Sequence, residues 1–109
     1  MMTVQMFAKQ CGFNVLSMPA PDRVPDGAYI GDLLSWVMGR AKSDNVWITI
    51  MSNVNVLAVA TLADISCIVL AEGVTLDEDV LLAAKNKGVN VLSTELSAYS
   101  AALKIAELV

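Results

Sequence analysis

Two short apolar runs constrain the fold of this chain more than any other feature. Val46 to Met51 and Cys67 to Ala71 are apolar at nearly every position, without the alternation that marks a half-exposed strand. Such runs are typical of strands covered on both faces, as in parallel sheets flanked by helices. With two further strand-like runs, Asn14 to Ser17 and Val89 to Ser93, the sequence predicts about four strands.

Helical patterns follow the strands. An apolar stripe at helical spacing predicts a helix from about Ile30 to Ala41, and another pattern predicts a helix from about Leu96 to Leu108. Good helix formers between Asn55 and Ile65 favour a helix there, although residues 56–60 could instead form a strand beside Val46 to Met51.

The clearest helix follows Cys67 to Ala71. Thr75 and Glu78 have the spacing of a capping box, which predicts the start of this helix. Lys85 and Lys87 suit its last turn, where the helix dipole favours positive charge, and Gly88 is the expected stop.

The alternation of strands and helices predicts an α/β fold with right-handed crossovers. We expect a single small domain over residues 1–109, with a core from about 13 to 108. Its mostly parallel sheet of about four strands is layered with about four helices. The stretch from Ser17 to Gly27 contains all three prolines and reads as a connecting loop, not as a domain boundary.

Composition excludes several kinds of chemistry. The chain has no histidine, so it lacks the common metal ligand and the usual partner of a catalytic serine or cysteine. Its 7 basic residues are scattered among 11 acidic ones, which argues against a nucleic-acid partner. Neither G-x-x-x-x-G-K-[ST] nor G-x-G-x-x-G occurs, so no known phosphate loop is present. Asp22, Asp26 and Asp32 could form an acidic cluster, but turn formation is the better reading, and we expect no metal site.

The cellular setting can also be narrowed. No signal-peptide pattern is present, and Cys11 and Cys67 are far apart in sequence, so we expect reduced thiols in a cytoplasmic protein. The uncharged stretch from Asn45 to Ala63 approaches the length of a membrane span. Asn53 and Asn55 would then lie mid-bilayer, so two buried elements joined by a polar turn are the better interpretation, with no membrane partner.

Candidate ligand contacts follow the strands, because ligands of open parallel sheets bind outside the carboxyl ends of the strands. These positions carry hydroxyls, amides and a carboxylate, which suit a polar small molecule: Ser17, Ser52, Asn53, Asn55, Glu72, Ser93 and Thr94. The competing interpretation is that these serine, threonine and asparagine side chains only cap the helices that follow. No residue is expected to be catalytic, since Glu72 and Glu95 read as solvated carboxylates.

Two predicted helices are apolar over more of their surface than one stripe: Trp36 and Met38 could make a second apolar face on the first, and the C-terminal helix is similarly wide. These residues are the candidates for a subunit interface: Trp36, Met38, Tyr99 and Leu103. Broad contact with the core is the alternative, and symmetric dimers are the commonest oligomers.

The pattern of the chain resembles the DRTGG-domain family. The similarity lies in Ala28 to Trp36, Trp47 to Asn53, Cys67 to Gly73 and Gly88 to Thr94, and it extends over nearly the whole chain. The five-residue signature that names the family does not occur, and the turn from Ser52 to Asn55 stands where it is expected.

This resemblance implies a regulatory module. Family domains accompany regulated pyrophosphatases, beside nucleotide-sensing CBS domains, and long phosphotransacetylases, and they tend to dimerise. We therefore expect a non-catalytic homodimer, without a cofactor, that senses a small molecule such as an adenine nucleotide. The alternatives are a docking subunit of a larger metabolic enzyme with no ligand of its own, and an enzyme working through carboxylates, hydroxyls and lysine. Some members are labelled serine kinases, but the missing phosphate loop excludes that activity here.

Overall fold

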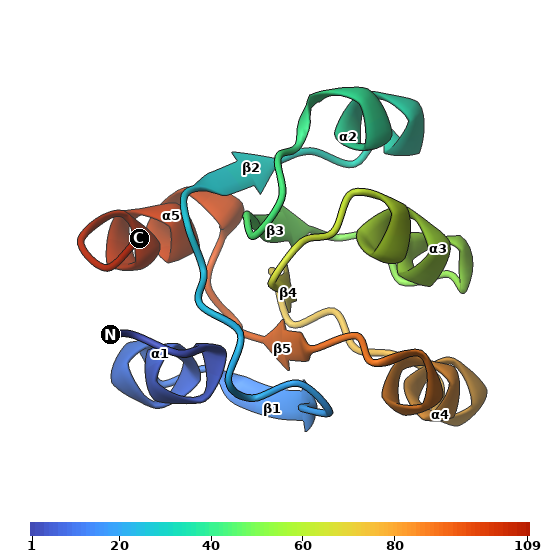
Figure 1. Cartoon of the computed structure of the whole chain (residues 1–109), viewed down its shortest axis with the longest axis horizontal. Helices are drawn as coiled ribbons and strands as arrows, with labels where there is room; N and C mark the ends of the chain where they lie inside the picture. The colour runs from blue at the N-terminus through green and yellow to red at the C-terminus, as the bar shows by residue number, and fades with distance from the viewer.

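The computed structural model describes residues 1–109 and places a five-stranded sheet between two layers of helices (Figure 1). Along the chain the elements are α1 (Val4–Cys11), β1 (Asn14–Ser17), β2 (Ala28–Ile30), α2 (Leu34–Arg40), β3 (Val46–Thr49), α3 (Asn55–Leu62), β4 (Cys67–Leu70), α4 (Glu78–Lys87), β5 (Val91–Ser93) and α5 (Ala98–Ala106). The predicted α/β class with a mostly parallel sheet is confirmed, with one strand and one helix more than expected.

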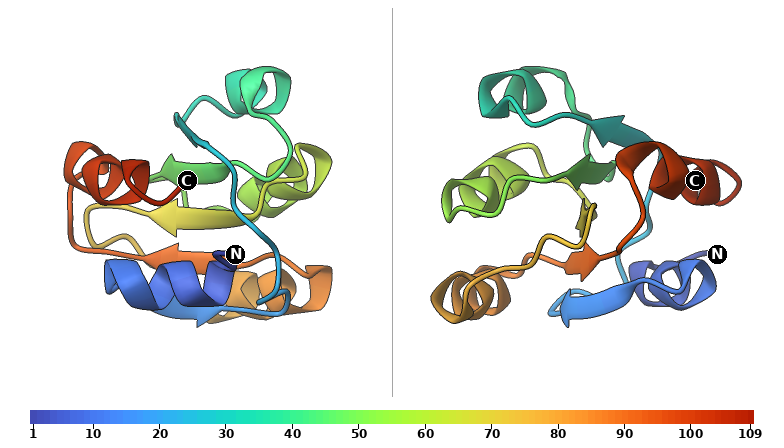
Figure 2. Two further views of the ribbon diagram at one scale, coloured as in Figure 1. Left: turned by 60° about the vertical axis from the view of Figure 1, so that its left-hand side comes forward. Right: turned by 180° about the vertical axis from the view of Figure 1, so that it is seen from behind.

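The strands lie in the order β1-β5-β4-β3-β2. The four strands β2 to β5 are mutually parallel, whereas β1 is antiparallel to β5 at one edge. The left view of Figure 2 shows β3, β4 and β5 pointing one way and β1 the other. The carboxyl ends of β2 to β5 therefore share one edge of the sheet, and the end of β1 lies at the opposite edge.

The two faces of the sheet have separate cores. Helices α1 and α5 cover one face, while α2, α3 and α4 cover the other (Figures 1 and 2). In β3, Val46 and Ile48 belong to the first core and Trp47 to the second, and all three are fully buried. Burial on both faces explains why this strand shows no apolar–polar alternation. None of the helices has the length and apolar character needed to cross a bilayer.

The region around Ile30 differs from the prediction of a helix from Ile30 to Ala41. Ala28 to Ile30 form the short strand β2, and α2 begins only at Leu34. Gly31 separates the two, because the ring of Tyr29 folds so close that a Cβ on Gly31 would lie 2.9 Å from it. The indole Nε1 of Trp47 donates a hydrogen bond to the Gly31 carbonyl over 2.8 Å, which fixes this turn.

The structure also tests the predictions for α3 and α4. Residues 56–60 belong to α3, so the strand alternative is wrong. The capping box from Thr75 to Glu78 is also wrong, because α4 begins at Glu78 after Asp77, and no side chain caps it. The stop at Gly88 is confirmed, since this glycine takes the left-handed conformation (φ 76°) that ends many helices.

The connection from β1 to β2 crosses the amino ends of the parallel strands. The buried side chain of Asn90 binds it by accepting from the N–H of Ala20 (2.9 Å) and donating to the Ala20 carbonyl (2.7 Å). Asn45 donates to the carbonyl of Asp26 over 2.8 Å. The buried polar residues before β3 and β5 thus hold this connection, as expected for buried amides that must be hydrogen-bonded.

Candidate functional site

The predicted contacts gather at the carboxyl edge of the sheet, with one exception. Ser52, Asn53 and Asn55 follow β3, Glu72 follows β4, and Ser93 and Thr94 close β5. Ser17 ends the antiparallel β1 and lies at the opposite edge, where its buried hydroxyl donates to the Val89 carbonyl over 2.9 Å. Ser17 therefore has a structural role far from the other six residues.

At the end of β3, an acidic residue organises the turn. Asp32 Oδ1 accepts hydrogen bonds from the Thr49 hydroxyl (2.7 Å) and from the N–H of Ile50 (3.0 Å). Asp32 follows β2 after a single residue, Gly31, so it joins the same edge of the sheet. The sequence pattern does not place Asp32 at this edge, because the three-residue strand before it is too short to give a recognisable pattern.

The loop between β3 and α3 leaves several backbone N–H groups without a hydrogen-bond partner. Asn53 Oδ1 accepts from the N–H of Asn55 over 2.9 Å, which is a local turn that starts the helix. The backbone N–H groups of Ser52, Asn53 and Val54 make no hydrogen bond within the chain. Three free donors therefore precede an uncharged helix, whose dipole favours negative charge at this end.

The loops after β4 and β5 are joined to each other. The N–H of Glu72 donates to the Leu96 carbonyl (2.8 Å), and that of Gly73 donates to the Thr94 carbonyl (2.9 Å). Both Glu72 (φ 61°) and Gly73 (φ 75°) have left-handed backbones. Left-handed backbone is uncommon for a residue other than glycine, so this corner is held by its hydrogen bonds.

A second carboxylate lies against the same corner. The side chain of Glu95 packs over Gly73, so that a Cβ on Gly73 would lie 2.5 Å from Glu95 Oε2. Thr94 Oγ1 accepts from the N–H of Leu96 over 3.2 Å, and both Ser93 and Thr94 are buried. These two residues build the corner, while the carboxylates of Glu72 and Glu95 are exposed.

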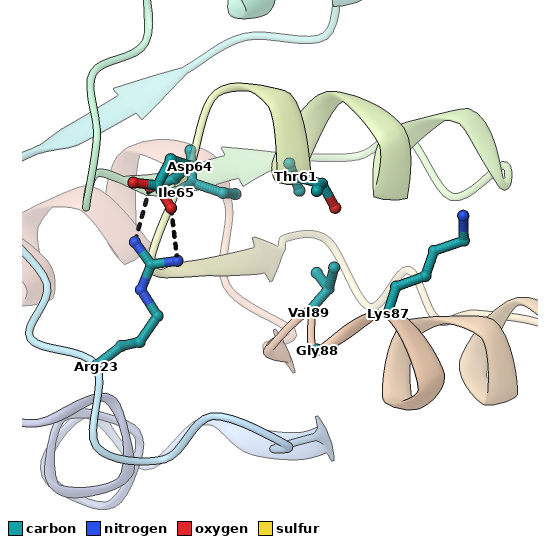
Figure 3. Close-up of a pocket in the computed structure, with 8 residues that line it drawn as sticks. Arg23, Thr61, Asp64, Ile65, Lys87, Gly88 and Val89 are labelled. Atoms are coloured by element: carbon teal, nitrogen blue, oxygen red, sulfur yellow. Dashed lines mark hydrogen bonds and ion pairs between the residues drawn. The ribbon is translucent and has the colours of Figure 1, made fainter.

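The most enclosed cavity lies at the other edge of the sheet, near the ends of α3 and α4. It measures about 120 Å³ and includes Arg23, Thr61, Asp64 and Lys87 in its lining (Figure 3). Arg23 pairs with Asp64 over 3.1 Å and with Asp44 over 2.6 Å, and it also donates to the Asp64 carbonyl over 2.8 Å. Two carboxylates already neutralise the Arg23 guanidinium, so Arg23 links neighbouring loops and presents no unpaired positive charge to the cavity.

The contacts around Arg23 shift the pKa values of Arg23 and Asp64. A hydrogen bond from Ser43 and the charge of Arg23 lower the pKa of Asp64. Burial alone would lower the pKa of Arg23, but its bonds to Asp44 and Asp64 outweigh this and raise it. Both shifts favour the charged forms of Arg23 and Asp64.

The structure contains neither a metal-binding cluster nor an exposed cysteine. No three histidine, cysteine, aspartate or glutamate residues lie close enough to hold a metal ion. Both cysteines are free and buried. Burial raises the pKa of Cys67 to about 12 and also raises that of Cys11, so neither presents a thiolate nucleophile.

Comparison with known proteins identifies the family of this chain. The sequence pattern of the DRTGG domain matches residues 30–108. The chain belongs to the DRTGG domain family. No curated protein is similar enough in sequence to count as a match.

A solved structure extends the comparison to the N-terminal elements. It contains the CBS and DRTGG domains of the regulatory region of Clostridium perfringens pyrophosphatase, complexed with the activator diadenosine tetraphosphate. The TM-score is 0.79 at 12% identity, and the match covers 99% of this chain and 47% of that chain. At this identity the likeness establishes the fold, and this chain spans about half of that regulatory region.

Proposed function

We propose that this protein is a non-catalytic regulatory module of the cytoplasm that binds an adenine nucleotide and acts as a homodimer. The observation that carries the proposal is the match over 99% of the chain to a regulatory region that was solved with an adenine dinucleotide activator. A sensing role needs no catalytic group, and the chain has no histidine that could serve as one.

The carboxyl edge of the sheet is the proposed binding surface. The free N–H groups of Ser52, Asn53 and Val54 suit phosphate oxygens, because a helix start combines unpaired donors with a favourable dipole. The exposed carboxylate of Glu72 could accept hydrogen bonds from ribose hydroxyls or an adenine amine. Asn55 is exposed beside them, whereas Ser93 and Thr94 would act by shaping the corner.

Calorimetric and thermal-shift titrations with AMP, ADP, ATP and diadenosine tetraphosphate test the proposal. A ligand at 100 times its dissociation constant stabilises the folded state by about 2.7 kcal/mol. Each kcal/mol raises the midpoint of a domain of this size by roughly 4–8 °C, so we expect a rise of about 10 °C or more.

Two variants locate the binding surface. Asn55→Ala should weaken binding, while Ser43→Ala, at the opposite edge, should leave it unchanged. No stabilisation by any of the four nucleotides would refute the nucleotide proposal.

A docking role without a ligand is the second candidate. All four residues predicted for an interface are strongly exposed, at 52% for Trp36, 45% for Met38, 72% for Tyr99 and 55% for Leu103. They come from α2 and α5, on opposite faces of the sheet. This candidate predicts that the module binds a larger metabolic enzyme with unchanged affinity in the presence or absence of nucleotides.

A further inference from the structure

Helix α3 has an outer face that nothing covers. Its eight residues, Asn55 to Leu62, include no charged side chain. A helix that is apolar all round is normally buried on all sides. Here Val56, Leu57, Val59 and Ala60 face the core, yet Leu62 is 70% exposed. The outer side of α3 therefore has the composition of a covered surface.

The apolar surface continues onto α4. A shallow hollow of about 400 Å³ between the two helices is lined by Ala58, Thr61, Leu62 and Lys87. Leu82, on the outer side of α4, is 60% exposed. We call the outer sides of α3 and α4 the α3–α4 face; it is the right-hand side of the molecule in Figure 1.

The outer stripe of α4 is self-complementary in charge. Glu78, Leu82 and Lys85 recur at helical spacing and are all exposed, opposite the inward-facing Val80 and Ala84. At a rise of 1.5 Å per residue, Glu78 lies about 6 Å before Leu82 and Lys85 about 4.5 Å after it. The stripe therefore has an acid and a base at similar distances on either side of one leucine.

This pattern distinguishes two ways of stacking a second copy. If the helices of the two copies ran parallel, Glu78 would face Glu78 and Lys85 would face Lys85. With the helices antiparallel, about a two-fold axis near Leu82, Glu78 faces Lys85 of the partner subunit at both ends. An apolar centre within a rim of opposite charges is the usual composition of a protein interface.

We propose that the α3–α4 face is the homodimer interface, occupied by a second copy of this chain with its helices antiparallel. The inference rests on the dimer in the proposed function and assigns it to this face, in place of α5 with Tyr99 and Leu103. Charge complementarity favours a second copy because the same stripe supplies both signs.

Charge reversal followed by sedimentation equilibrium tests this interface. Glu78→Lys and Lys85→Glu, each alone, place like charges opposite one another twice per dimer. We expect each to raise the dimer dissociation constant about tenfold, equivalent to about 1.4 kcal/mol. The double variant E78K/K85E restores opposite charges and should return the dissociation constant to near that of the unmodified chain.

Asp79→Lys is the matched control. It makes the same change of charge in the same helical turn, but its side chain points about 100° away from Glu78. We expect it to leave the dissociation constant unchanged, which separates pairing across the interface from effects of net charge or of the helix dipole. Thermal melts of all variants verify that they are folded.

Four results would overturn the assignment. These are a monomeric chain at all concentrations, single variants that dimerise normally, a double variant as weak as the singles, and dissociation by Leu103→Glu but not by Leu82→Glu. The last result would show that the chain forms a homodimer through α5 instead. A variant that no longer dimerises but still binds a nucleotide would overturn only the interface, and the nucleotide-binding part of the proposed function would stand.

Discussion

Single buried amides hold the connection between β1 and β2. Asn90 makes three hydrogen bonds, two to the backbone of Ala20 and one to the carbonyl of Ser66. Because Asn90→Ala leaves buried partners unsatisfied, we expect it to reduce the free energy of unfolding by about 3 kcal/mol. Urea denaturation measures this change. Asn86→Ala is the matched control, since Asn86 is exposed on α4, and equal effects of both variants would contradict the argument.

Two glycines should respond in opposite ways to the same substitution. Gly73 has φ 75°, and a Cβ there would lie 2.5 Å from Glu95 Oε2. Gly39 lies within α2, and a Cβ there meets nothing within 4 Å. We expect Gly73→Ala to destabilise the fold by about 1–2 kcal/mol. Gly39→Ala should stabilise it by up to about 1 kcal/mol. Thermal melts that moved both midpoints in one direction would disprove this account.

Some residues of the candidate site could be placed from the sequence alone, and others could not. Asn53, Glu72 and Thr94 follow strands that the apolar runs predicted, so their place at the carboxyl edge was predictable. Ser17 also follows a predicted strand, but the direction of β1 depends on contacts with β5 that leave no local signal. Asp32 was missed as a site neighbour because β2 has only three residues between glycines, too few for a periodic pattern.

At the scale of elements, the ion pairs of Arg23 with Asp44 and Asp64 join three loops, those between β1 and β2, between α2 and β3, and between α3 and β4. Asp64 has a pKa below its usual 3.8, mainly through Ser43 and Arg23. A carboxylate with a lowered folded-state pKa contributes stability above its unfolded pKa and loses it as the pH falls through the folded pKa. Asp64→Asn should therefore reduce stability at neutral pH, with a difference that shrinks as the pH falls below 3.8 and through the lower folded-state pKa. Denaturation from pH 2 to pH 7 measures it, with Asp22→Asn as the control, and a difference independent of pH would contradict this.

Elements differ in how clearly their sequences define them. Helix α4 carries acids in its first turn, lysines in its last turn and Gly88 at its end, and it was predicted with the correct stop. Helix α1 has comparable signals, with Thr3 capping Met6 and Gly12 in a left-handed conformation, but its eight residues were not recognised as a helix. The start of α4 was placed too early, because Thr75 has the right spacing but the chain turns into the helix only at Asp77.

At the scale of the whole molecule, the family pattern and the folding unit do not coincide. The DRTGG pattern covers residues 30–108, whereas the core beneath α1 and α5 has 13 buried residues. Five of these 13 precede that range: Val4, Phe7, Ala8, Cys11 and Phe13. Fully burying one large apolar side chain contributes about 1.5–3 kcal/mol, and a domain is stable by only about 5–15 kcal/mol in total. The segment before residue 30 is therefore part of the fold and not an appendage.

A truncated chain of residues 30–109 should consequently fail to fold. Without α1 and β1, the sheet face around Val69 and Leu92 would be exposed to water. We expect the fragment to lack a cooperative thermal transition, whereas removal of Met1 alone, which is 95% exposed, should leave the midpoint unchanged. Circular dichroism during heating compares the two. A cooperative transition of the 30–109 fragment near that of the full chain would show that the family pattern alone defines the folding unit.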